Sequence, residues 1–214
     1  MTAGRNRVAR LCSQQRLWSV HARRRGRSRK PGPPVHDDLV RREFTAPAPD
    51  RLWLTDISEH PTSEGKLYLC AVKDACSKRI VGYSMAEKMT SQLAVDALAN
   101  AVTLRRPTAA LTVVHSDRGS QFRSHAYVRA LRDARLRGSM GRVGACADNA
   151  AMESFFALLQ KNVLNRRRWA TRDQLRLAIV VWIETTYHRR RRQDTLGRLT
   201  PIEFETLHQT AHAA

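Results

Sequence analysis

The sequence has few of the residues and runs that mark secreted, membrane-spanning or zinc-binding proteins. Its four cysteines, Cys12, Cys70, Cys76 and Cys146, form no CxxC pair and have no flanking histidine pattern. We therefore expect reduced thiols and no zinc site. No run of eighteen apolar residues is present, and the arginine-rich N-terminus lacks the apolar stretch of a secretory signal. No membrane association is expected.

Acidic residues are also scarce. The 214 residues include 38 Lys and Arg against 19 Asp and Glu, which gives a net charge of +19 and a pI near 11.2. Such a surface attracts polyanions, and nucleic acid is the usual one. Only six of the basic residues are lysines. This arginine excess is consistent with a GC-rich genome and equally with bidentate phosphate contacts.

The N-terminal part differs in composition from the rest. Residues 1–30 hold ten basic side chains and no acidic one, and the run HARRRGRSRKPGPP (residues 21–34) is basic and contains Pro and Gly. A partial apolar stripe of Val8, Leu11 and Trp18 predicts a short helix. We expect residues 1–34 to form a basic, mobile DNA-binding arm, with a solvated charge run as the alternative. Residues 35–206 are expected to form the core, and residues 207–214 a disordered tail.

The core has the pattern of an α/β domain. The runs RLWLTDIS, KLYLCAVKD and RIVGYSM, separated by turn-prone HPTSEG and ACSK, predict an antiparallel meander. A buried strand is predicted over 110–114, a helix over 122–133, an extended piece near 138–141 and a helix from Asp148. This order predicts a mixed five-stranded sheet, a meander followed by parallel strands, with helices on both faces. The predicted helix that precedes the 110–114 strand has one apolar face: Leu93, Ala97, Leu98, Ala101 and Leu104.

Two aspartates are placed to meet at this sheet. Asp56 is in phase with Leu52 and Leu54, and a buried aspartate is costly unless it is paired or ligates a cation. Asp117 follows the 110–114 strand, and ligand sites gather at the carboxyl ends of strands. The two carboxylates converge if their strands are neighbours. The alternatives are a strand-end turn for Asp56 and a helix cap for Asp117.

A third carboxylate, Glu153, lies on the rim of an apolar helix stripe. The stripe consists of Met152, Phe155, Phe156, Leu159 and Val163. At about 100° per residue, the glutamate is one step round from Met152, where it can reach across the sheet edge. An exposed helix acid is the alternative for this residue alone. Together, Asp56, Asp117 and Glu153 predict a two-metal site for phosphoryl transfer on nucleic acid.

The chain resembles the OrfB-type transposases of bacterial insertion sequences, which are relatives of retroviral integrases. The resemblance covers residues 35–206 and rests on LWLTDISEHPTSEGKLYLCAVKD, IVGYS, VVHSDRGSQF, GSMGRVGACADNAAMESFFALLQK and LGRLTPIEFE. It implies an RNase H-like catalytic core in which Asp56, Asp117 and Glu153 are the DDE metal ligands. It also implies two Mg²⁺ ions, with Mn²⁺ as a substitute, DNA nicking, and strand transfer by the freed 3′-hydroxyl.

The resemblance also implies partners. We expect DNA ends and target DNA as ligands, a homo-oligomer on DNA, and an upstream DNA-binding subunit or frameshift fusion. The expected location is the bacterial cytoplasm, at the nucleoid. Two hypotheses compete with an active transposase: an RNase H-like nuclease without strand transfer, and a truncated, inactive DNA-binding remnant.

Further residues are expected to contact DNA or to orient the ligands. Many relatives have a lysine seven residues after the glutamate, where this chain has Gln160, followed by Lys161. A second helix, rich in core residues, is bracketed by arginine clusters, beside which Trp169 and Tyr187 could stack on bases. His115 is expected to be structural. The residues predicted to contact DNA are Arg118, Gln121, Asn149, Gln160, Lys161, Arg166, Arg167, Arg168, Arg189, Arg190 and Arg191.

Overall fold

The structure is a computed structural model that describes Gln14, residues 33–141 and residues 150–213, with side chains described as far as residue 210. The chain divides into two compact units, Met1–Lys30 and Pro31–Ala214. The fold below is that of the second unit. The predicted N-terminal helix, Asp148 and Asn149 lie outside the described residues.

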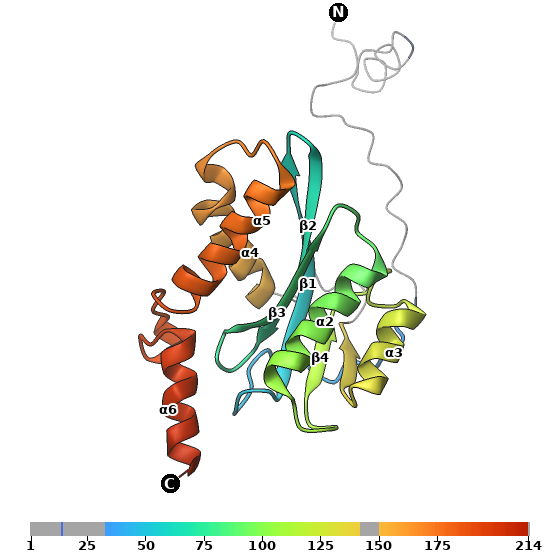
Figure 1. Ribbon diagram of the computed structural model, residues 1–214. Helices are drawn as coiled ribbons and strands as arrows, with labels where there is room; N and C mark the ends of the chain where they lie inside the picture. Colours follow the sequence, from blue (N-terminus) through green and yellow to red (C-terminus); the bar gives the residue numbers. More distant parts are fainter. Residues whose placement is uncertain (1–13, 15–32, 142–149, 214) are drawn as a thin grey trace, which may run out of the picture. The chain divides into compact units, whose positions relative to one another are not determined.

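The core contains the mixed five-stranded sheet that the sequence predicts (Figure 1). Strands β1 (Leu52–Thr62), β2 (Gly65–Asp74) and β3 (Ile80–Ala86) form the antiparallel meander. Strands β4 (Val113–Ser116) and β5 (Arg137–Met140) continue the sheet on the other side of β1, and β1–β4 and β4–β5 are parallel pairs. The order is β3-β2-β1-β4-β5, which places β1 in the centre.

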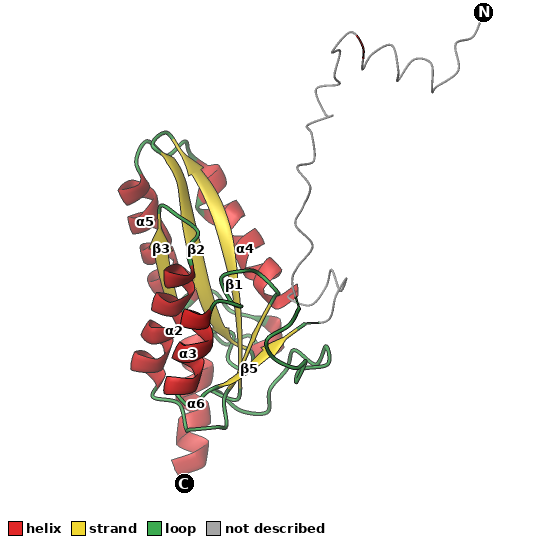
Figure 2. Ribbon diagram, turned by 90° about the vertical axis from the view of Figure 1, so that its right-hand side faces the viewer, coloured by secondary structure: helices red, strands yellow, loops and turns green. Residues whose placement is uncertain are grey.

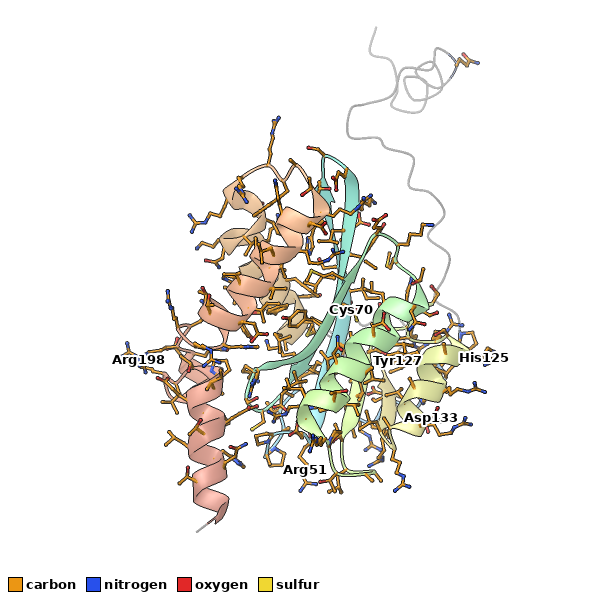
Figure 3. All side chains as sticks on the ribbon, viewed as in Figure 1. Arg51, Cys70, His125, Tyr127, Asp133 and Arg198 are labelled. Carbon is orange, nitrogen blue, oxygen red and sulfur yellow. The ribbon has the colours of Figure 1, made fainter. Side chains whose placement is uncertain are left out.

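Helices cover both faces of the sheet (Figures 1 and 2). Helices α2 (Ser91–Arg105) and α3 (His125–Asp133) pack on one face. Cys70 of β2 and Tyr127 of α3 are buried in the hydrophobic cluster between these helices and the sheet (Figure 3). Helices α4 (Ala150–Asn162) and α5 (Arg172–Val181) pack on the other. Helix α6 (Pro201–Ala213) ends the described chain, and three short helical segments lie between α4 and α6: Leu164–Arg166, Trp182–Tyr187 and Asp194–Leu196.

The α2 face is mostly the predicted one. Leu93, Ala97, Leu98 and Ala101 of the predicted apolar face are buried, whereas Leu104 is 56% exposed. Leu104 lies in the last turn of the helix, beyond the buried part of its face. A Cβ on Gly82 of β3 would lie 2.5 Å from the carbonyl oxygen of Ala97, so the small residues permit close contact between helix and sheet.

Several predicted boundaries were wrong. The strand predicted over 110–114 is instead β4, which begins at Val113, after a turn with Ala110 at φ +61°. The predicted turn at HPTSEG is shorter, because β1 continues to Thr62 and β2 begins at Gly65. The helix predicted from residue 122 begins at His125, where the side chain of Ser124 accepts the amide of Tyr127 (3.1 Å).

The disordered tail predicted for residues 207–214 was wrong for residues 207–213, which belong to α6. Its N-terminus has a capping box: Thr200 N–H donates to Glu203 (2.9 Å), and Glu203 N–H donates to the Thr200 hydroxyl (3.2 Å). Pro201 in the first helical position supports the same start. Within the described residues, no helix is long and apolar enough to cross a membrane.

Candidate active site

Asp56 and Asp117 occupy matching positions on adjacent parallel strands. The β1–β4 register pairs Leu54 with His115, and each aspartate lies two residues further along its chain. The condition for convergence of these carboxylates is therefore met, because β1 and β4 are neighbours. Asp56 lies within β1 and is partly buried, whereas Asp117 directly follows β4 and is exposed.

Helix α4 places Glu153 over the same face of the sheet. Met152, Phe155 and Leu159 of α4 join Leu52 and Leu54 of β1 in one hydrophobic cluster. Since side chains alternate along a strand, Asp56 points to the side of Leu52 and Leu54, toward α4. Glu153 lies in the first turn of α4 and is exposed, beside the buried stripe as its helical phase predicts.

The charges of Asp117 and Glu153 both act electrostatically on Asp56. Burial raises the pKa of Asp56 to about 6; the bond from Ile57 N–H (2.7 Å) lowers that pKa, and the charges of Asp117 and Glu153 raise it further. Among the described residues, however, no group of three His, Cys, Asp or Glu side chains is close enough to hold one ion. The structure thus brings the three carboxylates into one electrostatic field without arranging them as a closed ligand set.

The loop after β4 is held by its own polar groups. The Asp117 carboxylate accepts the amide of Gly119 (2.9 Å), and a Cβ on Gly119 would lie 2.9 Å from the same oxygen. Arg118 Nε donates to the carbonyl of Gly141 (2.7 Å), and the Gln121 amide donates to the carbonyl of Met89 (3.1 Å). Arg118 and Gln121 therefore fix the loop that carries Asp117.

A buried lysine at this site was missed by the sequence reasoning. Lys73 of β2 is 5% exposed, and its ammonium donates to the carbonyl of Ala151 (2.9 Å) in the first turn of α4. Burial, together with the charges of Lys78 and Arg191, lowers the pKa of Lys73 to about 7. The signal was present in the sequence, because Lys73 is in phase with the apolar residues Leu67, Leu69 and Ala71.

Family comparison agrees with this arrangement. Two protein-family models described as "Integrase core domain" match this chain, one over residues 46–146 and the other over residues 134–201. A 31 kDa protein of the insertion element IS600 of Shigella sonnei is 39% identical over 211 residues, which cover 97% of this chain and 77% of that protein. The chain belongs to the insertion-sequence transposases of the DDE/integrase superfamily.

Other relatives and solved structures agree with this assignment. The InsF transposase of insertion sequence IS3A from Escherichia coli K12 is 40% identical over 174 residues, covering 81% of this chain and 60% of that protein. This chain therefore spans less than two thirds of that relative. The HTLV-2 integrase catalytic core in complex with magnesium superimposes with a TM-score of 0.57 at 17% identity, covering 75% of this chain and 99% of that chain. An intasome of simian T-cell lymphotropic virus superimposes with a TM-score of 0.54 at 17% sequence identity, covering 81% of this chain and 60% of that chain. These likenesses establish an RNase H-like fold.

The residues predicted to contact DNA are mostly exposed, as a binding role requires. Gln160 and Lys161 are exposed near the end of α4, and Gln160 donates to Asn165 (2.5 Å). The side chains of Arg166, Arg167, Arg168, Arg189, Arg190 and Arg191 are likewise exposed. Asn149 lies outside the described residues. Their DNA contacts stay a prediction.

The predicted stacking groups were wrong. Trp169 is only 7% exposed and lies beneath the guanidinium of Arg167, which is 4.3 Å from the ring centroid. Tyr187 is 1% exposed and packs edge-on against Phe155, with its hydroxyl donating to the carbonyl of Lys78 (2.9 Å). The sequence places both aromatics beside arginines, but their rings complete the hydrophobic core.

His115 is buried at 2% exposure, in agreement with a structural role. Its Nδ1 forms a hydrogen bond with the hydroxyl of Ser139 in β5 (2.9 Å). This bond ties β4 to the edge strand just before the Asp117 loop. The histidine therefore supports the strand end from which Asp117 extends.

Proposed function

We propose that this chain is the catalytic part of a transposase that nicks DNA and joins DNA strands by phosphoryl transfer at Asp56, Asp117 and Glu153. The observation that carries the proposal is the matching position of Asp56 and Asp117 on neighbouring parallel strands, with α4 and its Glu153 packed over the same face. Family membership supports it, because InsF proteins are transposases.

Divalent cations would be held by these three side chains. Carboxylate oxygens are the ligands that Mg²⁺ and Mn²⁺ prefer, and bound cations would offset the charges of Asp117 and Glu153 that act on Asp56. We propose two Mg²⁺ ions, for which Mn²⁺ can substitute. When bound, the ions supply charge neutralisation on the attacking and leaving oxygens. The HTLV-2 integrase core, described in complex with magnesium, supports this choice.

The protein's own part is to bind and orient DNA. The exposed arginines 166–168 and 189–191 would contact phosphates, which fix register without reading sequence. Residues 1–34 would add a basic arm, and residues 35–206 the core. We further propose assembly as a homo-oligomer on element-end and target DNA, aided by an upstream DNA-binding subunit or fusion, at the bacterial nucleoid.

The test is a strand-nicking and strand-joining assay on a labelled duplex that carries the element end, with Mg²⁺ or Mn²⁺. Wild type is compared with Glu153→Gln, which preserves side-chain size and removes the charge. We expect metal-dependent nicked and joined products from wild type and none from the variant. Equal products from both would contradict the assignment of Glu153.

The same assay separates the competing functions. Nicked products without joined ones would indicate an RNase H-like nuclease. DNA binding without any product, also after addition of the element's upstream protein, would indicate an inactive DNA-binding remnant. Both results would contradict the proposed transposase activity.

A further inference from the structure

A hollow lined by both apolar and polar side chains lies between the β1–β2 hairpin and the C-terminal end of α4. Its volume is about 340 Å³, within the range of ligand pockets, which is roughly 300–1,000 Å³. The residues that matter for its chemistry are His60, Gln160, Asn165, Arg167, Arg168 and Trp169. None of them belongs to the three-carboxylate site.

The hollow opens on the same side of the sheet as the carboxylates. His60 is four residues after Asp56 on β1, so both side chains point to the same face, about 13 Å apart at ~3.3 Å per residue. Gln160 is seven residues, or about two turns, after Glu153 on α4. Both side chains therefore lie on the same side of the helix, about 10 Å apart at ~1.5 Å per residue. The hollow thus lies roughly 10–13 Å from the carboxylates along both elements, which corresponds to about three or four nucleotides at ~3.4 Å per step.

The interior of the hollow has an unsatisfied polar group. His60 is 2% exposed, and its Nε2 has no hydrogen-bond partner among the described residues. Burial lowers the pKa of His60 to about 4, so the imidazole is neutral at physiological pH. A buried ring nitrogen without a partner costs free energy, which a ligand or a bound water can recover.

The rim supplies hydrogen-bonding amides and positive charge. The Gln160 amide donates to the Asn165 side chain, which leaves the remaining amide groups of both able to bind another molecule. Arg167 and Arg168 are exposed, and Arg167 covers the indole of Trp169. Amides beside an arginine plane are the groups that recognise an unpaired base, while a second guanidinium suits its phosphate.

We propose that this hollow binds one unpaired nucleotide of the DNA strand, three or four nucleotides from the phosphate that is cut. The base enters beside His60, Gln160 and Asn165, and the phosphate is held at Arg168. A fully paired duplex does not fill the hollow, because its bases are stacked and paired. The inference rests on the proposed function, since the carboxylate site locates the cut.

The test compares two DNA probes of equal duplex length, one blunt and one with a short 3′ single-stranded overhang that carries 2-aminopurine. Binding is followed by anisotropy of an end label and by 2-aminopurine emission. We expect wild type to bind the overhang probe about tenfold more tightly, equivalent to one stacked and hydrogen-bonded base. One overhang position should change its emission on binding.

Variants assign the preference to the hollow. Asn165 is exposed, so Asn165→Trp should fold normally and fill the hollow, and Arg168→Ala should remove the phosphate contact. Both variants should abolish the tenfold preference for the overhang probe, so that the two probes bind with about equal affinity. Arg166→Ala is the matched control, because Arg166 is a neighbouring exposed arginine that does not line the hollow. Arg166→Ala should weaken the binding of both probes by the same factor. Thermal melting checks that each variant is folded.

Two results would overturn the proposal: equal wild-type affinity for both probes, or an overhang preference that persists in Asn165→Trp. An equal loss of preference in all three variants would do so as well, since it would assign the effect to general phosphate contacts. Metal-dependent nicking by wild type is a separate readout. If nicking persists while the preference is absent, only the nucleotide pocket fails. If the preference maps to the hollow without any nicking, only the catalytic proposal fails.

Discussion

The buried ammonium of Lys73 donates a hydrogen bond to the carbonyl of Ala151, two residues before Glu153. This contact ties the central part of the sheet to the first turn of α4. A cation at a helix N-terminus opposes the helix dipole, and burial adds a desolvation cost. Such a cost is typical of a functional site, and we expect Lys73 to position the glutamate helix.

We expect Lys73→Met to separate stability from activity. Replacing a buried charge by an apolar side chain of similar length should leave stability unchanged or raise it by about 1–4 kcal/mol. Nicking should nevertheless fall about tenfold, since the first turn of α4 is no longer tethered to β2. Denaturant melts and single-turnover nicking measure the two effects. Unchanged nicking would show that the hydrogen bond of Lys73 does not position Glu153.

The stability difference between Lys73→Met and wild type should depend on pH. The pKa of Lys73 is lowered from 10.5 to about 7 in the folded protein, so between these values the unfolded chain binds more protons. The burial cost is therefore complete below pH 7 and disappears as the pH rises toward 10.5. Melting temperatures of the two proteins should converge over this window. If the melting temperatures of the two proteins instead changed in parallel with pH, the lowered pKa of Lys73 would be contradicted.

Asp56→Asn should stabilise the protein while abolishing nicking. The pKa of Asp56 is raised from 3.8 to about 6, which means that its ionised form is disfavoured in the native state. At ~1.4 kcal/mol per pKa unit, the gain is about 1–3 kcal/mol. It should be complete above pH 6 and vanish as the pH falls toward 4, where the native carboxyl is already protonated. A metal-free melting series from pH 4 to 8 tests this, and no gain at pH 7 would contradict a desolvation cost for the ionised Asp56 carboxylate.

Helix α6 should depend on Glu205 far more than on surface ion pairs. Glu205 is 4% exposed and accepts hydrogen bonds from Ser77, Arg79 and Arg105 at 2.7–2.8 Å. Glu205→Ala removes the shared acceptor of the buried Ser77 and of the partly buried Arg79 and Arg105, so we expect a loss of about 3–5 kcal/mol. The matched control is Glu59→Ala, because Glu59 and its partner Lys66 are both about half exposed; it should cost far less stability than Glu205→Ala. Similar losses in both variants would exclude a special role for the buried network.

DNA binding should weaken steeply with salt if phosphate contacts dominate. The triple variant of Arg166, Arg167 and Arg168 to alanine should reduce the slope of log affinity against log salt by about 3, near one for each arginine that binds a phosphate. Fluorescence anisotropy between 50 and 300 mM salt measures the slope. A wild-type affinity that is insensitive to salt would contradict the assigned role of the arginines.

Strand alternation and helix phase could be read from the sequence, and they place the residues of the candidate site. They place Asp56 with Leu52 and Leu54, and Glu153 beside Met152, and both relationships hold in the structure. Which strands are neighbours could only be stated as a condition, because local patterns do not encode long-range pairing.

Other features depend on tertiary contacts that local patterns do not reveal. Tyr187 is next to a run of basic residues yet lies in the aromatic core, and Lys73 occupies a position on a buried face of its strand. The continuation of α6 depends on capping by Thr200 and Glu203 and on burial of Glu205. Periodicity alone could not supply these contacts, although the Thr200–Glu203 spacing was a visible capping signal.

The central claim is that Asp56, Asp117 and Glu153 hold the catalytic metals, and metal-specific rescue tests it most directly. Each is replaced by cysteine in turn, and nicking of the element-end duplex is measured with Mg²⁺ and with the more thiophilic Mn²⁺. Because Mg²⁺ prefers oxygen ligands and softer metals accept thiolate, we expect each variant to be inactive with Mg²⁺ and partly restored with Mn²⁺. Full activity with Mg²⁺ in any of the three variants would contradict the assignment of that residue as a metal ligand.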